Sequence, residues 1–167
     1  MITYISGGTR SGKSRYAQQR ALALSSSPVY IATARVWDDE FASRVQRHQA
    51  DRGQEWTTYE TCQHLYRLPL ANEVVVIDCV TLWLANYYAE LPYDEILPVF
   101  QKEIDELVKL SGIFFVISNE IGMGLHADSQ AGRKFTDLQG WANQYVASVA
   151  DEAVFMVSGL PLTVKEP

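Results

Sequence analysis

The sequence lacks the features that mark most secreted, membrane-spanning and nucleic-acid-binding proteins. It has two cysteines, Cys62 and Cys79, without CxxC spacing and too few for a disulfide framework. No apolar run approaches the roughly 18 residues that a membrane-spanning helix needs. Acidic residues outnumber lysine and arginine, 20 against 14, and the net charge of −6 repels nucleic-acid backbones and anionic membranes. We therefore expect reduced thiols, no membrane span, no nucleic-acid partner, and local binding of any phosphate ligand.

The length and composition are those of one folded domain. The 167 residues suffice for one hydrophobic core but are few for two, and 47% of them are hydrophobic. We expect a single domain over residues 1–167. From Met1 the chain enters the strand-like stretch Ile2–Ile5 directly, which leaves no room for a signal peptide. The expected location is therefore the cytoplasm.

Short apolar runs alternate with longer amphipathic stretches along the chain. The apolar runs are Ile2–Ser6, Val29–Thr33, Val74–Asp78, Ile113–Ser118 and Ala153–Val157. The helical stretches are Gly12–Leu24, Asp38–Arg52, Thr81–Glu90, Tyr93–Leu110 and Arg133–Ala150. This alternation predicts the α/β class, with a mostly parallel sheet and helices on both faces. The segment Ser158–Pro161 predicts a turn into a short edge strand at Leu162–Val164, for which antiparallel pairing is possible.

Ligands of such a sheet bind beyond the carboxyl ends of its strands. Here these are the segments after Ser6, Thr33, Asp78 and Ser118. Chemistry-bearing residues should therefore be sought in these four segments.

The segment after the first strand has the spacing of a phosphate-binding loop. Gly7–Ser14 reads GGTRSGKS and matches G-x-x-x-x-G-K-[ST] between a predicted strand and a predicted helix. Its glycines let backbone N–H groups turn toward a phosphate, and the helix N-terminus adds positive potential. Lys13 would reach the β- and γ-phosphates, and Ser14 would give an oxygen to Mg²⁺. The alternative is a glycine-rich structural turn, and the motif itself does not separate kinases, ATPases, GTPases and transferases.

A carboxylate ends the third apolar run. Val74–Asp78 has the form of the strand whose aspartate completes the Mg²⁺ shell of phosphate-loop enzymes, through a metal-bound water. Asp78 could instead cap the helix that begins near Thr81, and both roles are compatible.

A histidine lies between arginines in the second helical stretch. Arg44, His48 and Arg52 are spaced i, i+4 and i+8, which puts them on one helix face. A neutral imidazole can attack phosphorus, and guanidinium groups can neutralise a triphosphate. This spacing allows a covalent nucleotidyl-histidine, but it also fits an ordinary solvated helix face.

Several ordered motifs over nearly the whole chain resemble one family, the bifunctional adenosylcobinamide kinase and adenosylcobinamide-phosphate guanylyltransferases of cobalamin biosynthesis. They are Gly7–Ser14, Ile31–Ala34, the spaced His48, Arg52, Trp56, Thr58 and Glu60, then Asp78–Trp83, Ser118–Gly124, the spaced Asp137, Gly140, Asn143 and Gln144, and Gly159–Leu162. The sequence departs from the family's usual pattern at two places, one in the segment after Ser118 and one beyond it. Leu125, His126 and Ala127 stand where the family usually has Val-Pro, and Thr136 stands at an expected arginine.

The resemblance implies a RecA-like P-loop NTPase fold and two successive reactions. ATP or GTP would phosphorylate adenosylcobinamide, and GMP from GTP would then pass through His48 to adenosylcobinamide phosphate, giving adenosyl-GDP-cobinamide. The implied catalytic residues are His48, Lys13 and Asp78, with Mg²⁺ held by Ser14 and Asp78. The implied nucleotide-binding residues are Gly7, Gly8, Thr9, Arg10, Ser11, Gly12, Lys13, Ser14, Thr33, Arg35, Arg44, Arg52, Glu60 and Asp78. The family's tendency to trimers implies a homo-oligomer.

Other interpretations of the same residues are compatible with the sequence. A monofunctional small-molecule kinase or a GTPase-like regulatory module would share the phosphate loop. Asn119 and Glu120 could orient a substrate or a metal-bound water, or could cap their loop. Trp83 and Tyr87 could line a corrinoid cleft together with Trp37, or could belong to the core.

Overall fold

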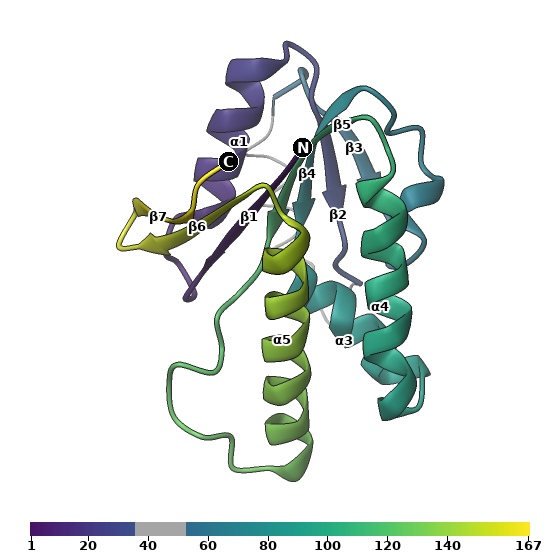
Figure 1. Cartoon of the computed structure of the whole chain (residues 1–167), viewed down its shortest axis with the longest axis vertical. Helices are drawn as coiled ribbons and strands as arrows, with labels where there is room; N and C mark the ends of the chain where they lie inside the picture. Colours follow the sequence, from purple (N-terminus) through teal and green to yellow (C-terminus); the bar gives the residue numbers. More distant parts are fainter. Residues whose placement is uncertain (36–52) are drawn as a thin grey trace.

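The computed structural model describes residues 1–35 and 53–167 of the chain. Within these residues one seven-stranded sheet runs in the order β3-β2-β4-β5-β1-β6-β7 (Figure 1). The strands are β1 (Ile2–Gly7), β2 (Val29–Ala32), β3 (Thr57–Glu60), β4 (Glu73–Asp78), β5 (Gly112–Ile117), β6 (Glu152–Val157) and β7 (Leu160–Lys165). The helices are α1 (Lys13–Leu24), η1 (Leu65–Arg67), α3 (Val80–Glu90), α4 (Tyr93–Val108) and α5 (Gln130–Val149).

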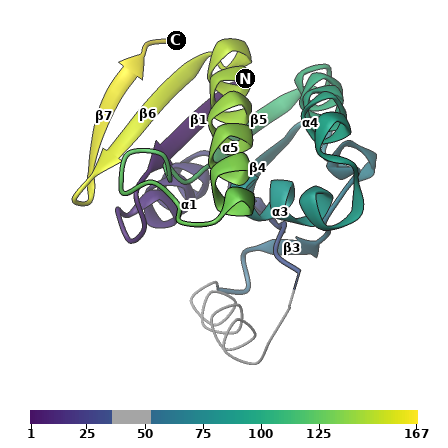
Figure 2. The ribbon, with the colours of Figure 1, turned by 90° about the horizontal axis from the view of Figure 1, so that it is seen from below.

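The predicted architecture is confirmed. Strands β1 to β6 pair in parallel, and β7 pairs antiparallel with β6. Helix α1 packs on one face of the sheet, while α3, α4 and α5 cover the other. Figure 2 gives the view from below. The helix predicted at Asp38–Arg52 lies outside the described residues.

One edge of the sheet was not expected from the sequence. Strand β3 pairs with β2 in the register Val29–Thr57 to Ala32–Glu60, although it reads Thr-Thr-Tyr-Glu and is mostly exposed. An edge strand needs backbone partners on one side and little apolar burial. A search for apolar runs therefore misses it.

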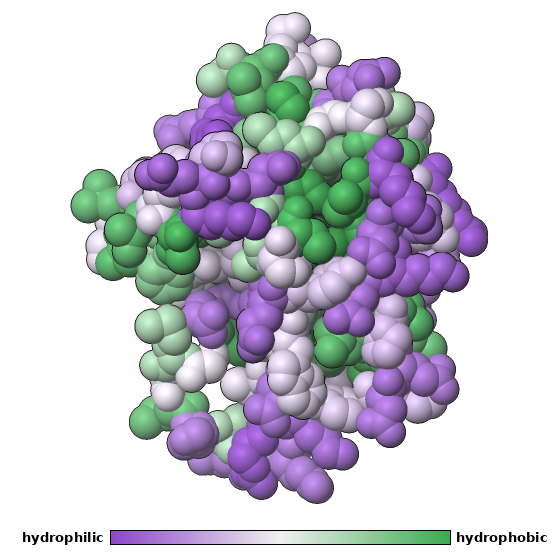
Figure 3. All heavy atoms as spheres, in the orientation of Figure 1, coloured by the Kyte–Doolittle hydropathy of each residue, from purple (hydrophilic) through white to green (hydrophobic). Residues whose placement is uncertain are grey.

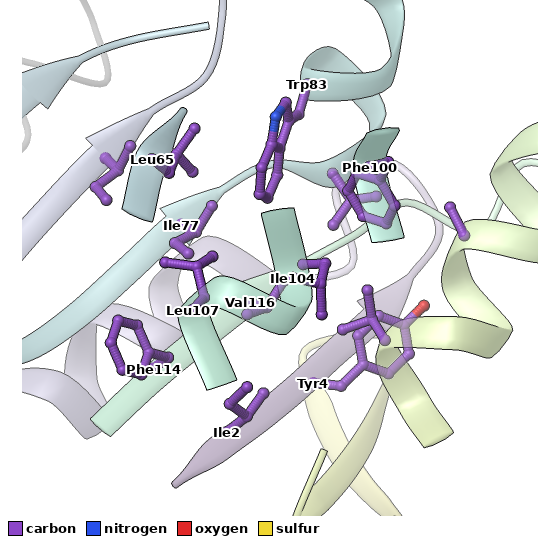
Figure 4. Packing of buried hydrophobic residues seen from close by; sticks show 14 of the residues in the cluster. Ile2, Tyr4, Leu65, Ile77, Trp83, Phe100, Ile104, Leu107, Phe114 and Val116 are labelled. Carbon is purple, nitrogen blue, oxygen red and sulfur yellow. The ribbon is translucent and has the colours of Figure 1, made fainter. Parts of the chain in front are cut away.

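Alternation along the strands divides the core between the two faces. In β1, Ile2 and Tyr4 point toward α3, α4 and α5, whereas Ile5 points toward α1. Figure 4 shows the larger cluster, where Trp83 meets Phe100 edge-on with ring centroids 5.0 Å apart. Trp83 is 0% exposed and Tyr87 2% exposed. Both are therefore core residues and do not line a corrinoid cleft.

The buried carboxylate of Glu103 in α4 holds the segment after β3 against the helices. It accepts hydrogen bonds from the backbone N–H of His64 at 2.7 Å and of Leu65 at 3.2 Å, and from the hydroxyl of Tyr87. Burial, together with the bond to Glu103, raises the pKa of Tyr87, so its hydroxyl stays a donor. This contact fixes η1 against α4.

The opposite edge of the sheet is apolar and exposed. Strand β7 carries Leu160, Leu162 and Val164, which are 71%, 57% and 69% exposed. Figure 3 shows apolar side chains gathered over this edge. No helix within the described residues combines the length and hydrophobicity needed to cross a membrane.

Candidate functional site

A cavity of about 790 Å³ opens where the carboxyl ends of β1, β2, β4 and β5 meet. Its walls come from residues 9–15, from Tyr30, Asp78 and Asn119, and from the turn 158–159 between β6 and β7. This volume is in the range of small-molecule sites, and the position is where parallel α/β sheets bind ligands. Three of the four segments singled out from the sequence, those after Ser6, Asp78 and Ser118, supply polar groups to it.

The phosphate loop has backbone geometry that depends on glycine at particular positions. Gly7 has φ +149° and Gly12 has φ +96°. A Cβ on Gly7 would lie 2.6 Å from the carbonyl oxygen of Met156, whereas a Cβ on Gly8 would meet nothing within 4 Å. Gly7 is thus required by the fold itself, while the space beside Gly8 is open.

The loop and the N-terminus of α1 together present positive potential to the cavity. Helix α1 begins at Lys13 directly after Gly12 and has no acidic residue in its first turn. The positive end of the helix dipole is therefore left to a bound anion. This arrangement suits a phosphate group.

Lys13 lies folded over the loop that precedes it. Its ammonium donates to the carbonyl oxygens of Gly7 at 2.9 Å and Gly8 at 2.7 Å. The side chain is buried, and burial lowers the pKa of Lys13. An incoming triphosphate would offer this ammonium anionic oxygens in place of neutral carbonyls, which is a stronger pairing.

Ser14 and Asp78 meet at the floor of the cavity. The hydroxyl of Ser14 donates to Oδ2 of Asp78 at 2.7 Å, and the hydroxyl of Tyr30 donates to the same oxygen at 2.7 Å. The sequence led us to expect Ser14 and Asp78 together, but it gave no sign of Tyr30. A tyrosine inside the apolar stretch Val29–Thr33 is not distinguishable from a core residue by pattern.

Thr33 is hydrogen-bonded to the backbone of Asp78 and Cys79. Its hydroxyl donates to the carbonyl oxygen of Cys79 and accepts from the Cys79 N–H, both at 2.8 Å, and its own N–H donates to the Asp78 carbonyl oxygen at 3.0 Å. Thr33 is 0% exposed and is not among the residues that line the cavity. The carbonyl oxygen of Thr33 accepts from Asn86 at 2.8 Å, so α3 is tied to the same point.

A polar network joins α5 to the cavity through Asn119. Asn119 donates through its side-chain amide to Thr81 Oγ1 at 3.1 Å and through its backbone N–H to the same oxygen at 3.2 Å. Its carbonyl oxygen accepts from Asn143 at 3.2 Å, and Asn143 Oδ1 accepts from Ser118 at 2.6 Å and from Gln139 at 2.8 Å. Asn119 therefore reaches the cavity on a rigid support.

The turn between β6 and β7 is a wall of the cavity that sequence reasoning did not identify. Ser158 and Gly159 have φ +51° and +86°, and the Gly159 N–H donates to the carbonyl oxygen of Ser11 at 3.0 Å. A Cβ on Gly12 would lie 3.2 Å from Gly159 Cα. The Gly-Leu-Pro-Leu motif of the sequence contains this glycine, and it could have indicated that the turn belongs to the site.

The remaining candidate residues lie away from the cavity or outside the described part of the chain. Arg35 pairs with Glu90, with 2.7 Å between Nη1 and Oε1, and Glu60 lies exposed at the end of β3. Glu120 accepts the Gly122 N–H at 3.1 Å and so caps its own loop. The predicted residues Arg44, His48 and Arg52 lie outside the described residues.

Among the described residues, no three His, Cys, Asp or Glu side chains converge in a way that could hold a metal ion. A Mg²⁺ in a phosphate site needs less, because substrate phosphates and waters fill most of its octahedral shell. The pair of Ser14 and Asp78 oxygens therefore fits Mg²⁺ as a partner of a bound nucleotide.

Comparisons with known proteins show the family to which the chain belongs. The sequence pattern of the CobU family, described as cobinamide kinase / cobinamide phosphate guanyltransferase, matches residues 3–164. The bifunctional adenosylcobalamin biosynthesis protein CobU of Escherichia coli K12 is 35% identical over 182 aligned positions, covering 99% of this chain and all of the relative. The protein of the same name from Salmonella typhimurium is 30% identical over 182 positions with the same coverage. The corresponding CobP of Pseudomonas aeruginosa is 33% identical and covers 99% of this chain and 98% of the relative.

Among solved structures, the fold is similar to the flagellar accessory protein FlaH from Methanocaldococcus jannaschii. The TM-score is 0.50 at 14% identity, over 99% of this chain and 78% of FlaH. This likeness supports a RecA-like P-loop fold and nothing about activity. From the family match and the full-length relatives, the chain belongs to the CobU family and is a bifunctional enzyme, a cobinamide kinase and cobinamide phosphate guanylyltransferase acting with nucleotide substrates.

Proposed function

We propose that one domain, residues 1–167, carries both reactions on adenosylcobinamide, with the cavity at the sheet edge as the kinase site. The observation that carries this proposal is the convergence of Lys13, Ser14 and Asp78 on the floor of a cavity large enough for a nucleotide. Phosphoryl transfer asks a protein mainly for positioning and for neutralisation of charge. The three side chains supply both.

In the kinase reaction, the terminal phosphoryl group of ATP or GTP passes to the hydroxyl of adenosylcobinamide. The bond from the γ-phosphorus to its bridging oxygen breaks, a bond to the substrate oxygen forms, and the hydroxyl proton is released. Lys13 leaves the carbonyl oxygens of the loop and pairs with the β- and γ-phosphates. The N–H groups of residues 7–14 and the positive end of α1 hold the phosphate chain.

Ser14 and Asp78 would hold Mg²⁺, Ser14 directly and Asp78 through a bound water. When bound, this ion neutralises charge on the phosphate oxygens. The hydroxyl of Ser14 now donates to Asp78 and would turn its lone pairs toward the ion. Asp78 would keep that hydroxyl oriented.

In the guanylyltransferase reaction, a ring nitrogen of His48 attacks the α-phosphorus of GTP, and pyrophosphate leaves. The phosphate oxygen of adenosylcobinamide phosphate then attacks the same phosphorus, releases the imidazole, and forms adenosyl-GDP-cobinamide. Support for His48 comes from its place in the motif shared with the family. Arg44 and Arg52, at i−4 and i+4 from His48, would neutralise the triphosphate.

The other candidate residues contribute to nucleotide binding in this proposal. Thr33 acts through the backbone of Asp78 and Cys79, to which it is hydrogen-bonded. Arg35 and Glu60 lie on the β2–β3 side of the sheet, outside the residues that line the cavity, and would contact the part of GTP that extends beyond it, the base or ribose.

We further propose a homo-oligomer in the cytoplasm, where ATP and GTP are available. The exposed apolar side chains of β7 support association, because contiguous apolar surface of this kind commonly covers an interface. A trimer is the state implied by the resemblance. Light scattering on the protein emerging from a sizing column measures the mass directly.

The experiment supplies adenosylcobinamide, Mg²⁺ and GTP labelled at either the γ- or the α-phosphate. The wild type should move γ-label into adenosylcobinamide phosphate and α-label into the guanylylated product. Lys13→Ala should abolish both transfers, whereas the matched surface variant Lys109→Ala should keep both. Retention of γ-transfer in Lys13→Ala would overturn the assignment of the cavity.

His48→Ala separates the two halves of the reaction. It should keep γ-transfer to adenosylcobinamide and lose α-transfer to adenosylcobinamide phosphate. If His48→Ala forms the guanylylated product at the wild-type rate, another residue carries GMP. The rival of a monofunctional kinase would show no α-transfer in the wild type either.

A further inference from the structure

The hydroxyl of Tyr30 is bonded to the carboxylate that the phosphate site uses. Tyr30 lies on β2, next to β4 in the sheet. Its Cα partner on β4 is Val76, which comes two residues before Asp78. Its hydroxyl donates to Asp78 Oδ2 at 2.7 Å, and its side chain is 2% exposed. An ionised carboxylate can only accept, so the direction of this bond is settled by chemistry.

Packing alone does not explain a tyrosine at this position. The ring lies in the apolar cluster between α1 and the sheet, with Ile5, Val76 and Phe115, and meets Trp56 edge-on with centroids 5.8 Å apart. Phenylalanine would make the same ring contacts. The added hydroxyl is tolerated in this buried place because it has the carboxylate as an acceptor.

The two donors on one oxygen determine how Asp78 faces the cavity. Ser14 and Tyr30 both donate to Oδ2, at 2.7 Å each. With Mg²⁺ bound, Ser14 would turn its oxygen toward the ion and keep its hydrogen on Asp78, while Tyr30 would hold the carboxylate from the side of the sheet. The second oxygen, Oδ1, would then accept from a metal-bound water.

We propose that Tyr30 is a positioning residue for the Mg²⁺-nucleotide complex, acting through Asp78. This inference rests on the proposed kinase site and adds a residue to it. Tyr30 lies in the wall of the cavity and acts on the ion through Asp78. Its hydroxyl fixes the rotamer of Asp78, so the site is prepared before the metal binds.

The test compares Tyr30→Phe with wild type by titration of a fluorescent GTP analogue. Binding is measured first in EDTA and then at increasing Mg²⁺. Tyr30→Phe should bind the metal-free analogue within twofold of wild type. The Mg²⁺ concentration for half-maximal tightening should rise about tenfold, the low end of what losing a hydrogen bond to a charged group costs.

Two controls separate this role from a general loss of structure. Tyr59→Phe removes a hydroxyl from a tyrosine on β3 that packs on the opposite face of the sheet, and it should leave the Mg²⁺ dependence unchanged. Tyr30→Phe in an Asp78→Asn background should shift the half-maximal Mg²⁺ concentration less than twofold, since the hydroxyl acts through Asp78.

Three results would overturn the proposal. They are an unchanged Mg²⁺ dependence in Tyr30→Phe, an equal loss of metal-free binding, and a shift of the same size with and without the Asp78 carboxylate. The readout needs neither corrinoid nor guanylyl transfer. A failure of the proposed reactions on adenosylcobinamide therefore leaves this test intact, and the reverse also holds.

Discussion

Replacing Gly7 with alanine tests whether the phosphate loop is held in shape by steric constraint. A Cβ at Gly7 would lie 2.6 Å from the Met156 carbonyl oxygen and 2.8 Å from Ser11 Oγ, at a φ of +149° that L-residues rarely adopt. The backbone conformation costs about 1–2 kcal/mol. Displacing the β6 carbonyl adds about 1–3 kcal/mol. We expect a total near 3 kcal/mol, which for a domain of this size lowers the melting temperature by about 10 °C.

The neighbouring Gly8 is the matched control. A Cβ there meets nothing within 4 Å, and Gly8 lies in the same loop. Gly8→Ala should change the melting temperature by less than about 2 °C, as expected for a site without steric conflict. Circular dichroism on heating, together with urea unfolding, measures both variants under the same conditions. Equal shifts in the two variants would refute the steric account of the loop.

Two further predictions concern groups buried outside the loop. Glu103→Gln places an amide where the carboxylate accepts hydrogen bonds from backbone N–H groups and from a tyrosine hydroxyl. It should lower the free energy of unfolding, measured in urea, by about 1–3 kcal/mol. An unfolding free energy equal to that of the wild type would contradict the role given to Glu103. Burial raises the pKa of Cys79 to about 12, so at pH 8 the thiol is neutral and iodoacetamide should not modify it until the protein unfolds. The half-buried Cys62 should react in the folded protein, and peptide mass spectrometry distinguishes the two; labelling of Cys79 as fast as Cys62 would count against its burial.

The sheet and its helices followed from periodicity because their burial is strongly patterned. Strands β1, β4, β5 and β6 are buried on both faces and read as apolar runs, and the structure confirms them within one or two residues. Strand β3 carries polar side chains on an exposed edge, so the same signal fails there. The prediction for Trp83 and Tyr87 failed for a related reason, because a sequence pattern does not distinguish an aromatic residue of the core from one that lines a cleft.

The site was predictable where a motif fixes backbone and side chain together. Lys13, Ser14 and Asp78 lie where the phosphate loop and the end of an apolar strand indicated. Tyr30 was not predictable, since its partner Asp78 is 48 positions away in the chain. Thr33, taken from a family motif, has its hydroxyl bonded to the Cys79 backbone. Such pairings depend on strand order, which no local pattern carries.

We propose that GMP passes through His48 on its way to adenosylcobinamide phosphate. The intact mass of the protein after incubation with GTP and Mg²⁺, beside His48→Ala under the same conditions, tests this step. We expect an added mass of one GMP on the wild type and none on His48→Ala. A wild type without the adduct that still binds nucleotide tightly, or the same adduct on His48→Ala, would contradict it.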